Sequence, residues 1–254
     1  LFNFIFSGVI FFSIYMNQGV TKFPLTVERV FDSPHQNELE EGDVVRSING
    51  VKIDKGSLDV FNFLDNSGSD KEYTYVVERD GQTVTLNNIV QNPPRIAQVL
   101  PKSAAISSGL DKGDVILSLN SNKINSFNQI KNFVEMSQGE ALTVEFWRNG
   151  KVLETKLKPL IVDVPTQSGG FERIYRIGIV SDYFPFEPET KRQSVLTALT
   201  NAIDSIYLIM QGSIKGLYHI LFGNISSCNL SGPISIAETS GQMVKQGGVN
   251  YFWF

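Results

Sequence analysis

The chain has 254 residues, of which 42% are hydrophobic and 19% are charged, and its formal net charge is −4. These proportions are typical of chains that fold, and they exclude a wholly disordered protein. The chain has no basic run, which argues against a nucleic-acid partner, and its single cysteine and two histidines cannot assemble a complete zinc site.

The chain begins with an apolar segment, residues 1–16, in which eight of sixteen side chains are Phe or Ile. As a helix it would reach about 24 Å, which is short of the roughly 30 Å hydrocarbon core of a bilayer. A signal peptide, a buried helix of a soluble protein and the C-terminal part of a transmembrane helix are the three interpretations. We favour the third, because the segment has no polar face and no basic start, and we expect the chain to be a piece of a longer protein at both ends.

An internal repeat follows, and it is the strongest signal in the sequence. The stretch 41–53 returns as 112–124, so that Gly42 and Gly113 lie 71 positions apart. A period this long is typical of small domains rather than of solenoid units. We therefore predict two domains of the same fold, at 23–94 and 95–183.

The local structure of each copy can be predicted from its turns. Gly-Asp begins a half-buried strand, and Asn49-Gly50 predicts a type I′ hairpin, of which Asn120-Ser121 is a weaker version. Short helices are expected at 57–64 and 126–136. Each helix precedes a hairpin that turns at Asp80-Gly81 or Asn149-Gly150. Each copy is thus a small β-rich module with one helix across its sheet.

Beyond the repeat, residues 193–222 have apolar side chains at helical spacing with polar residues between them. A helix of this length, about 45 Å, is long enough to cross a bilayer, to lie on one, or to pack within a soluble protein, and hydropathy alone does not decide between these. Residues 223–254 are expected to form a loop and the start of a further transmembrane helix.

The Gly-Asp repeat resembles the signature of PDZ domains of the circularly permuted bacterial type. The resemblance implies an α+β fold, with two tandem β-rich PDZ-like domains flanked by transmembrane or amphipathic helices. Such domains bind peptides by adding a strand to a free sheet edge beside a helix. In the second copy the resemblance places the peptide-binding residues at Tyr175, Arg176, Ile177, Gly178 and Ile179 on the edge, with Ile130, Phe133 and Val134 on the helix. The three helix residues are equally well explained as core.

Two further inferences concern the edges of the two copies. Gly178 is expected to let the backbone approach a ligand closely. In the first copy the corresponding edge is expected at 86–96, where Pro93-Pro94 lacks N–H donors, so peptide binding there is doubtful.

A second motif points to a family. Residues 229–237 resemble the motif that follows the third transmembrane helix in the regulator-of-sigma-E protease branch of the site-2 intramembrane zinc proteases. The motif residues are Asn229, Leu230, Ser231, Gly232, Pro233 and Ile234. The order of this motif relative to the two PDZ-like copies is also that of the family.

The resemblance implies a membrane-embedded zinc metalloendopeptidase of the bacterial inner membrane, with the PDZ pair on the periplasmic side controlling access of a peptide or an anti-sigma-factor-like membrane substrate. The zinc ligands and the general base of the family lie in His-Glu-x-x-His and Leu-Asp-Gly motifs, which this sequence lacks. No residue of this chain is therefore expected to be catalytic or to bind metal. The alternative is a non-catalytic, membrane-anchored PDZ adaptor or pseudoprotease.

Overall fold

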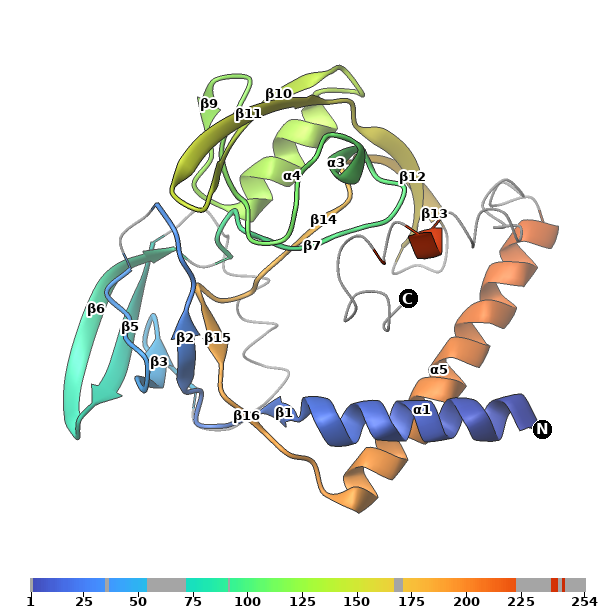
Figure 1. Cartoon of the computed structure of the whole chain (residues 1–254), viewed down its shortest axis with the longest axis horizontal. Helices are drawn as coiled ribbons and strands as arrows, with labels where there is room; N and C mark the ends of the chain where they lie inside the picture. Colours follow the sequence, from blue (N-terminus) through green and yellow to red (C-terminus); the bar gives the residue numbers. More distant parts are fainter. Residues whose placement is uncertain are drawn as a thin grey trace.

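The protein is a mixed α/β chain in which strands predominate, as a computed structural model shows (Figure 1). The structure describes residues 2–34, 37–53, 72–90, 92–166, 171–222, 239–241 and 244. The helix predicted at 57–64, the motif at 229–237 and most of the segment 223–254 lie outside the described residues.

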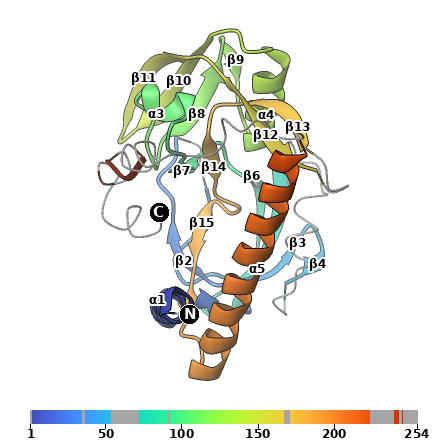
Figure 2. The ribbon, with the colours of Figure 1, turned by 90° about the vertical axis from the view of Figure 1, so that its right-hand side faces the viewer.

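Two long helices cross at one end of the molecule. They are α1 (Phe2–Gln18) and α5 (Val195–Leu221). The two helices cross in contact, and Figure 2, in which α1 is seen end-on, shows α5 rising from the crossing along the side of the β-rich part. The Ile206 side chain packs beside Gly8, and the hydroxyls of Tyr15 and Ser205 share a hydrogen bond of 2.6 Å. The crossing is therefore held by both close packing and a polar contact.

Both helices were predicted, but their membrane-spanning role is not shown. Among the helices in the described part of the chain, none combines enough length with enough apolarity to cross a membrane.

A short antiparallel ribbon joins this helical end to the rest of the chain. It consists of β1 (Val20–Thr21) and β16 (Thr190–Lys191), and the neighbouring Lys22 and Glu189 form an ion pair of 2.7 Å. The chain thus enters the β-rich part from α1 and leaves it toward α5 at the same place.

The β-rich part consists of two modules of like construction (Figure 1). The first module contains β2 (Val27–Val30), β3 (Val44–Ile48), β4 (Val51–Lys52), β5 (Glu72–Arg79) and β6 (Gln82–Val90), with a sheet of order β4-β3-β5-β6. Its core includes Val45, Ile48, Tyr73, Tyr75 and Val77. In β5 every second side chain from Tyr73 to Val77 is buried, as expected for a half-buried strand, whereas β3 buries Val45 and Ile48 on the two sides of a register shift between Val45 and Ser47.

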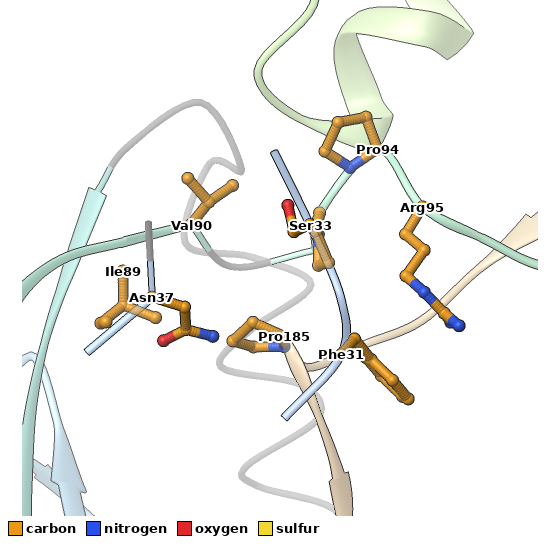
Figure 3. Close-up of a pocket in the computed structure, with 9 residues that line it drawn as sticks. Phe31, Ser33, Asn37, Ile89, Val90, Pro94, Arg95 and Pro185 are labelled. Atoms are coloured by element: carbon orange, nitrogen blue, oxygen red, sulfur yellow. The ribbon is translucent and has the colours of Figure 1, made fainter. Parts of the chain in front are cut away.

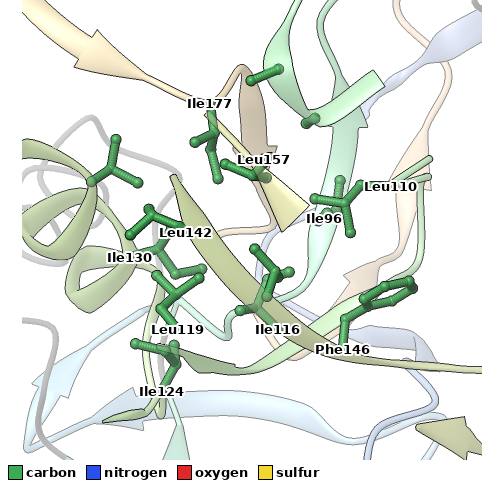
Figure 4. Packing of buried hydrophobic residues seen from close by; sticks show 14 of the residues in the cluster. Ile96, Leu110, Ile116, Leu119, Ile124, Ile130, Leu142, Phe146, Leu157 and Ile177 are labelled. Atoms are coloured by element: carbon green, nitrogen blue, oxygen red, sulfur yellow. The ribbon is translucent and has the colours of Figure 1, made fainter. Parts of the chain in front are cut away.

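The second module repeats this plan. It contains β7 (Ile96–Val99), α3 (Ala104–Ser107), β8 (Val115–Leu119), β9 (Asn122–Lys123), α4 (Phe127–Met136), β10 (Leu142–Arg148), β11 (Lys151–Leu157), β12 (Leu160–Pro165), β13 (Phe171–Arg176) and β14 (Ile179–Ser181). The sheet order is β11-β10-β8-β9, and α4 packs Ile130 onto the buried residues of that sheet (Figure 4). The predicted helix at 126–136 is confirmed.

The predicted turns are also confirmed. The φ angles are 48° at Asn49 and 79° at Gly50. At the later turn they are 50° at Asn149 and 82° at Gly150. Successive positive φ angles define the type I′ turn, which matches the twist of the strands on either side of it.

The strand that closes the first module comes from beyond the second. β15 (Phe186–Pro188) pairs with β2 of the first module, just as β14 pairs with β7 of the second. The second module is therefore inserted within the first, and the chain crosses between them twice, at 92–95 and at 182–185. The predicted ranges 23–94 and 95–183 left this closing strand out of the first module.

Candidate functional site

A groove with a cavity volume of about 330 Å³ lies in the second module between α4 and the segment 174–183. It is lined by Phe127, Ile130, Lys131, Val134, Glu135, Ile174, Tyr175, Arg176, Ile177, Gly178, Ile179, Val180, Ser181 and Tyr183. Seven of the eight residues singled out from the sequence are in this lining. The eighth, Phe133, is partly buried against the core of the module instead.

Hydrogen bonds and close packing fix the direction in which α4 runs along the groove. The Phe127 N–H donates to the Asn92 carbonyl, and the Asn92 N–H donates to the Tyr183 carbonyl, so α4 begins beside Tyr183. Just past the other end of α4, Gly139 lies so close to Tyr175 that a Cβ there would be 2.7 Å from the ring. The helix therefore runs antiparallel to the segment 175–183.

In the part of the chain that the structure describes, β14 pairs with no strand on its outer edge, which faces α4. On its other edge β14 pairs with β7, in register Ile179 to Val99 and Val180 to Gln98. The Gly178 carbonyl accepts a hydrogen bond of 2.8 Å from Leu100. Because backbone groups alternate in direction along a strand, the N–H and C=O of Ile179 point away from β7. They are the groups that an added peptide strand would use.

In the turn before β14 the backbone carbonyls accept hydrogen bonds, whereas the backbone amides donate none to a described backbone carbonyl. The Ile177 carbonyl accepts from the Ala105 N–H at 2.9 Å, and the Gly178 carbonyl accepts from Leu100. Within the described ranges, neither the Ile177 nor the Gly178 amide donates to a backbone carbonyl. Adjacent free N–H groups form a nest for an anion, and the exposed Arg176 adds positive charge beside it.

The structure shows a packing role of Gly178, and its predicted close approach to a ligand stays a prediction. Its φ is +80°, and a Cβ at this position would overlap Cβ of Ser103 and lie 2.9 Å from its hydroxyl. Ser103 is the N-cap of α3 and accepts from the Ile106 N–H at 3.2 Å. The glycine thus allows the turn to approach the start of α3, whereas the sequence had suggested a close approach to a ligand.

The first module has a different edge at the equivalent position. Its closing strand is β15, whereas β6, which contains much of the predicted edge 86–96, pairs with β5. The Pro185 carbonyl accepts from the Phe31 N–H, as the Gly178 carbonyl accepts from Leu100, so Pro185 takes the place of Gly178. Proline has no N–H, and the nest of the second module cannot form here. The predicted edge was wrong, although a proline again occupies the edge that the structure shows.

The two crossings between the modules meet at an ion pair. Arg95 donates to Asp182, and its guanidinium lies 4.0 Å from the centroid of the Phe31 ring. Burial raises the pKa of the Asp182 carboxyl above its ordinary range and outweighs the opposing effect of Arg95.

A small cavity of about 30 Å³ lies beside this ion pair. Figure 3 shows Pro94, Pro185 and Phe31 around it, from both crossings and from the segment after β2. Its volume admits about one water molecule, so it is a packing feature of the junction between the modules rather than a ligand site.

The repeated Gly-Asp motif has a structural role that was not evident from the sequence. Asp43 and Asp114 are 0% and 1% exposed, and each accepts two hydrogen bonds from one guanidinium, that of Arg79 or Arg148. The hydrogen bond from Arg148 to Asp114 raises the pKa of that guanidinium. The arginines were visible in the sequence as a repeated pair, Arg79 and Arg148, just before the second turn of each copy.

The described residues do not fit a zinc ion. Among them no group of three or more His, Cys, Asp or Glu side chains is placed to hold a metal. The two histidines of the chain are 184 positions apart, at 35 and 219, and residue 35 lies outside the described part. The family motif residues Asn229 to Ile234 lie outside it as well.

Comparison with known proteins gives a family match over the whole chain. The model of peptidase family M50 matches residues 1–254. The regulator of sigma-E protease RseP of Salmonella typhimurium is 29% identical over 167 residues, which are 65% of this chain and 36% of that protein. The zinc metalloprotease RasP of Geobacillus kaustophilus is 27% identical over 154 residues, or 61% of this chain and 34% of that protein. The matched region thus spans about a third of these relatives.

Solved structures also match parts of the chain. The PDZ domain of an SdrC-like protein from Listeria monocytogenes covers 35% of this chain and 87% of that domain, at 16% identity and a TM-score of 0.29.

Proposed function

We propose that this chain, which belongs to peptidase family M50, is the substrate-selecting part of a membrane-embedded zinc protease, and that its second module binds the carboxyl terminus of a peptide. The observation that carries the proposal is the open edge of β14, where Ile179 faces α4 across a groove with an apolar floor. The adjacent amides of Ile177 and Gly178 offer a place for the terminal carboxylate.

The proposed binding mode has a defined geometry. A peptide would lie antiparallel to β14, with its carboxylate at the turn 177–178 and its upstream residues toward Tyr183. Its terminal side chain would enter the apolar floor formed by Ile130, Val134 and Ile177, which are 2%, 3% and 4% exposed. Main-chain hydrogen bonds would then give affinity, and this floor would favour an apolar last residue.

The whole protein is proposed to hydrolyse peptide bonds of membrane-protein substrates. Relatives in the family are named regulator of sigma-E protease and zinc metalloprotease, which supports a zinc protease, and its place is proposed to be the bacterial inner membrane. Zinc would polarise the scissile carbonyl and activate a water molecule. The described residues do not fit the metal, so the part assigned to them is the selection of substrate and not a step of that chemistry.

Within such an enzyme the two modules would control access from the periplasmic side. The β1–β16 ribbon connects the modules directly to α1 and α5, and Figure 1 shows the first module nearer to α1 than the second. Large apolar side chains on the outer faces of α1 and α5, such as Phe4 and Leu196, offer contact with lipid or with other parts of the longer protein.

Peptide titration tests the proposal. The 254-residue chain in detergent should bind labelled peptides with a free, apolar carboxyl terminus, and amidation of that terminus should weaken binding because the nest then loses its anion. Methylation of successive peptide amides should weaken binding at alternate positions only, since only every second amide faces β14. Equal binding of the free and the amidated peptides would contradict the proposed site.

The access role needs a separate measurement. In the longer protein, Ile179→Pro removes the N–H on the open edge, and discrimination between substrates with and without a free apolar terminus should be lost. Unchanged discrimination would contradict the access role and leave peptide binding in place.

A further inference from the structure

Three charged side chains line the groove, two positive and one negative, and two of the three belong to α4. Lys131 and Glu135 are exposed residues of α4 that line the groove, and Arg176 lies at its carboxylate end. In the part of the chain that the structure describes, none of these three side chains forms an ion pair with another residue. Two cations and one anion thus face a ligand in the groove.

The position of Lys131 along the groove can be worked out from regular geometry. Side chains on one face of a strand recur every ~6.6 Å, and a helix covers that distance in about four residues. If the terminal side chain of a peptide packs on Val134, the side chain two positions earlier therefore lies beside Ile130 and Lys131. Of these two, Ile130 is 2% exposed and forms the floor, whereas Lys131 is exposed at the rim.

The surroundings of the Lys131 ammonium favour a negative partner. Its Nζ lies 5.6 Å from the centroid of the Phe127 ring, which is itself 6% exposed, so the lysine stem leans along the groove toward the start of α4. Glu135 is one helical turn away, toward the terminal-residue end, and does not pair with it in the structure. An ammonium held over an aromatic face and without an acidic partner is free to pair with a carboxylate brought by the ligand.

From this arrangement we propose that the groove selects peptides that have an apolar last residue and an acidic residue two positions before it, and that Lys131 determines the second preference. The inference rests on the proposed peptide binding at β14. It concerns a side chain of the ligand, whereas the proposed function concerns its main chain and its terminus.

The test uses the whole chain in detergent and three labelled hexapeptides that end in a free valine. The peptides differ only two positions before the end, where they carry glutamate, glutamine or lysine. We expect the glutamate peptide to bind about twofold to fivefold more tightly than the glutamine peptide, which is the range of a partly exposed ion pair, and the lysine peptide to bind most weakly. The preference should shrink as salt is raised.

Two variants separate the role of Lys131 from a general effect of charge. Lys131→Glu should reverse the order, so that the lysine peptide binds best. Lys123→Glu makes the same charge change on β9 of the same module, away from the groove lining, and should keep the original order.

The outcomes distinguish this inference from the function on which it rests. Equal affinity for all three peptides, or an order that Lys131→Glu does not change, would overturn the role of Lys131 while peptide binding stands. Failure of all three to bind would overturn the proposed function, and this inference with it.

Discussion

From the close approach of Gly178 to Ser103 we predict how much a side chain at position 178 destabilises the second module. Gly178→Ala places a Cβ at φ +80°, which costs about 1–2 kcal/mol, and presses that Cβ into Ser103, which costs about 1–3 kcal/mol more. The variant should therefore lower the free energy of unfolding of the second module by about 2–5 kcal/mol. Ser103→Gly removes the obstructing side chain, and since glycine is a tolerated N-cap it should itself cost only a few tenths of a kcal/mol.

In the Ser103→Gly background, Gly178→Ala should lower the free energy of unfolding only by the cost of the positive φ angle, about 1–2 kcal/mol. Urea unfolding can be followed by the fluorescence of Trp147 in β10, with Trp253→Phe as the common background because the chain has two tryptophans. Equal costs of Gly178→Ala with and without the Ser103 side chain would refute the packing explanation. A loss of peptide binding with unchanged stability would support close approach to a ligand instead.

Three further predictions concern other parts of the molecule. Asp114→Ala removes the buried carboxylate that accepts two hydrogen bonds from Arg148 and one from the Asp111 N–H, and urea unfolding should show the second module destabilised by about 3 kcal/mol; a cost below about 1 kcal/mol would contradict a structural role for the pair. Tyr15→Phe should lower the thermal stability of the chain in detergent by about 0.5–1.5 kcal/mol through loss of its bond to Ser205, and an unchanged midpoint would show that bond to be dispensable. Because the pKa of Asp182 is raised above 3.8 in the folded state, its contribution to the free energy of unfolding is largest below pH 3.8 and falls as the pH rises through the raised pKa. Asp182→Asn should remove this part of the pH dependence of the free energy of unfolding. A pH dependence that the variant leaves unaltered would contradict the raised pKa.

Much of each module could be predicted because its signals are local. Asn49-Gly50 and Asn149-Gly150 specify their turns through the φ angles that those residues tolerate, and the repeat itself gives the alternation of the strands. The groove residues were identified through a resemblance to known peptide-binding domains, and the structure brings seven of the eight together.

The insertion of one module into the other could not be read from the sequence. β15 is three residues long, contains a proline and pairs with a strand more than 150 positions earlier, so it has neither an alternating pattern nor a local partner. The packing of Gly178 against Ser103 was missed for a similar reason. Its contact with Ser103 spans 75 positions and exists only once both segments are folded.

The exchange rate of the Ile179 amide hydrogen, measured by NMR with and without a peptide that has a free apolar terminus, tests the proposed site most directly. The account predicts that this amide, which points away from β7, becomes protected when peptide is added, whereas the Val180 amide is already protected without it. Saturating peptide that leaves the Ile179 amide unprotected would contradict strand addition at β14.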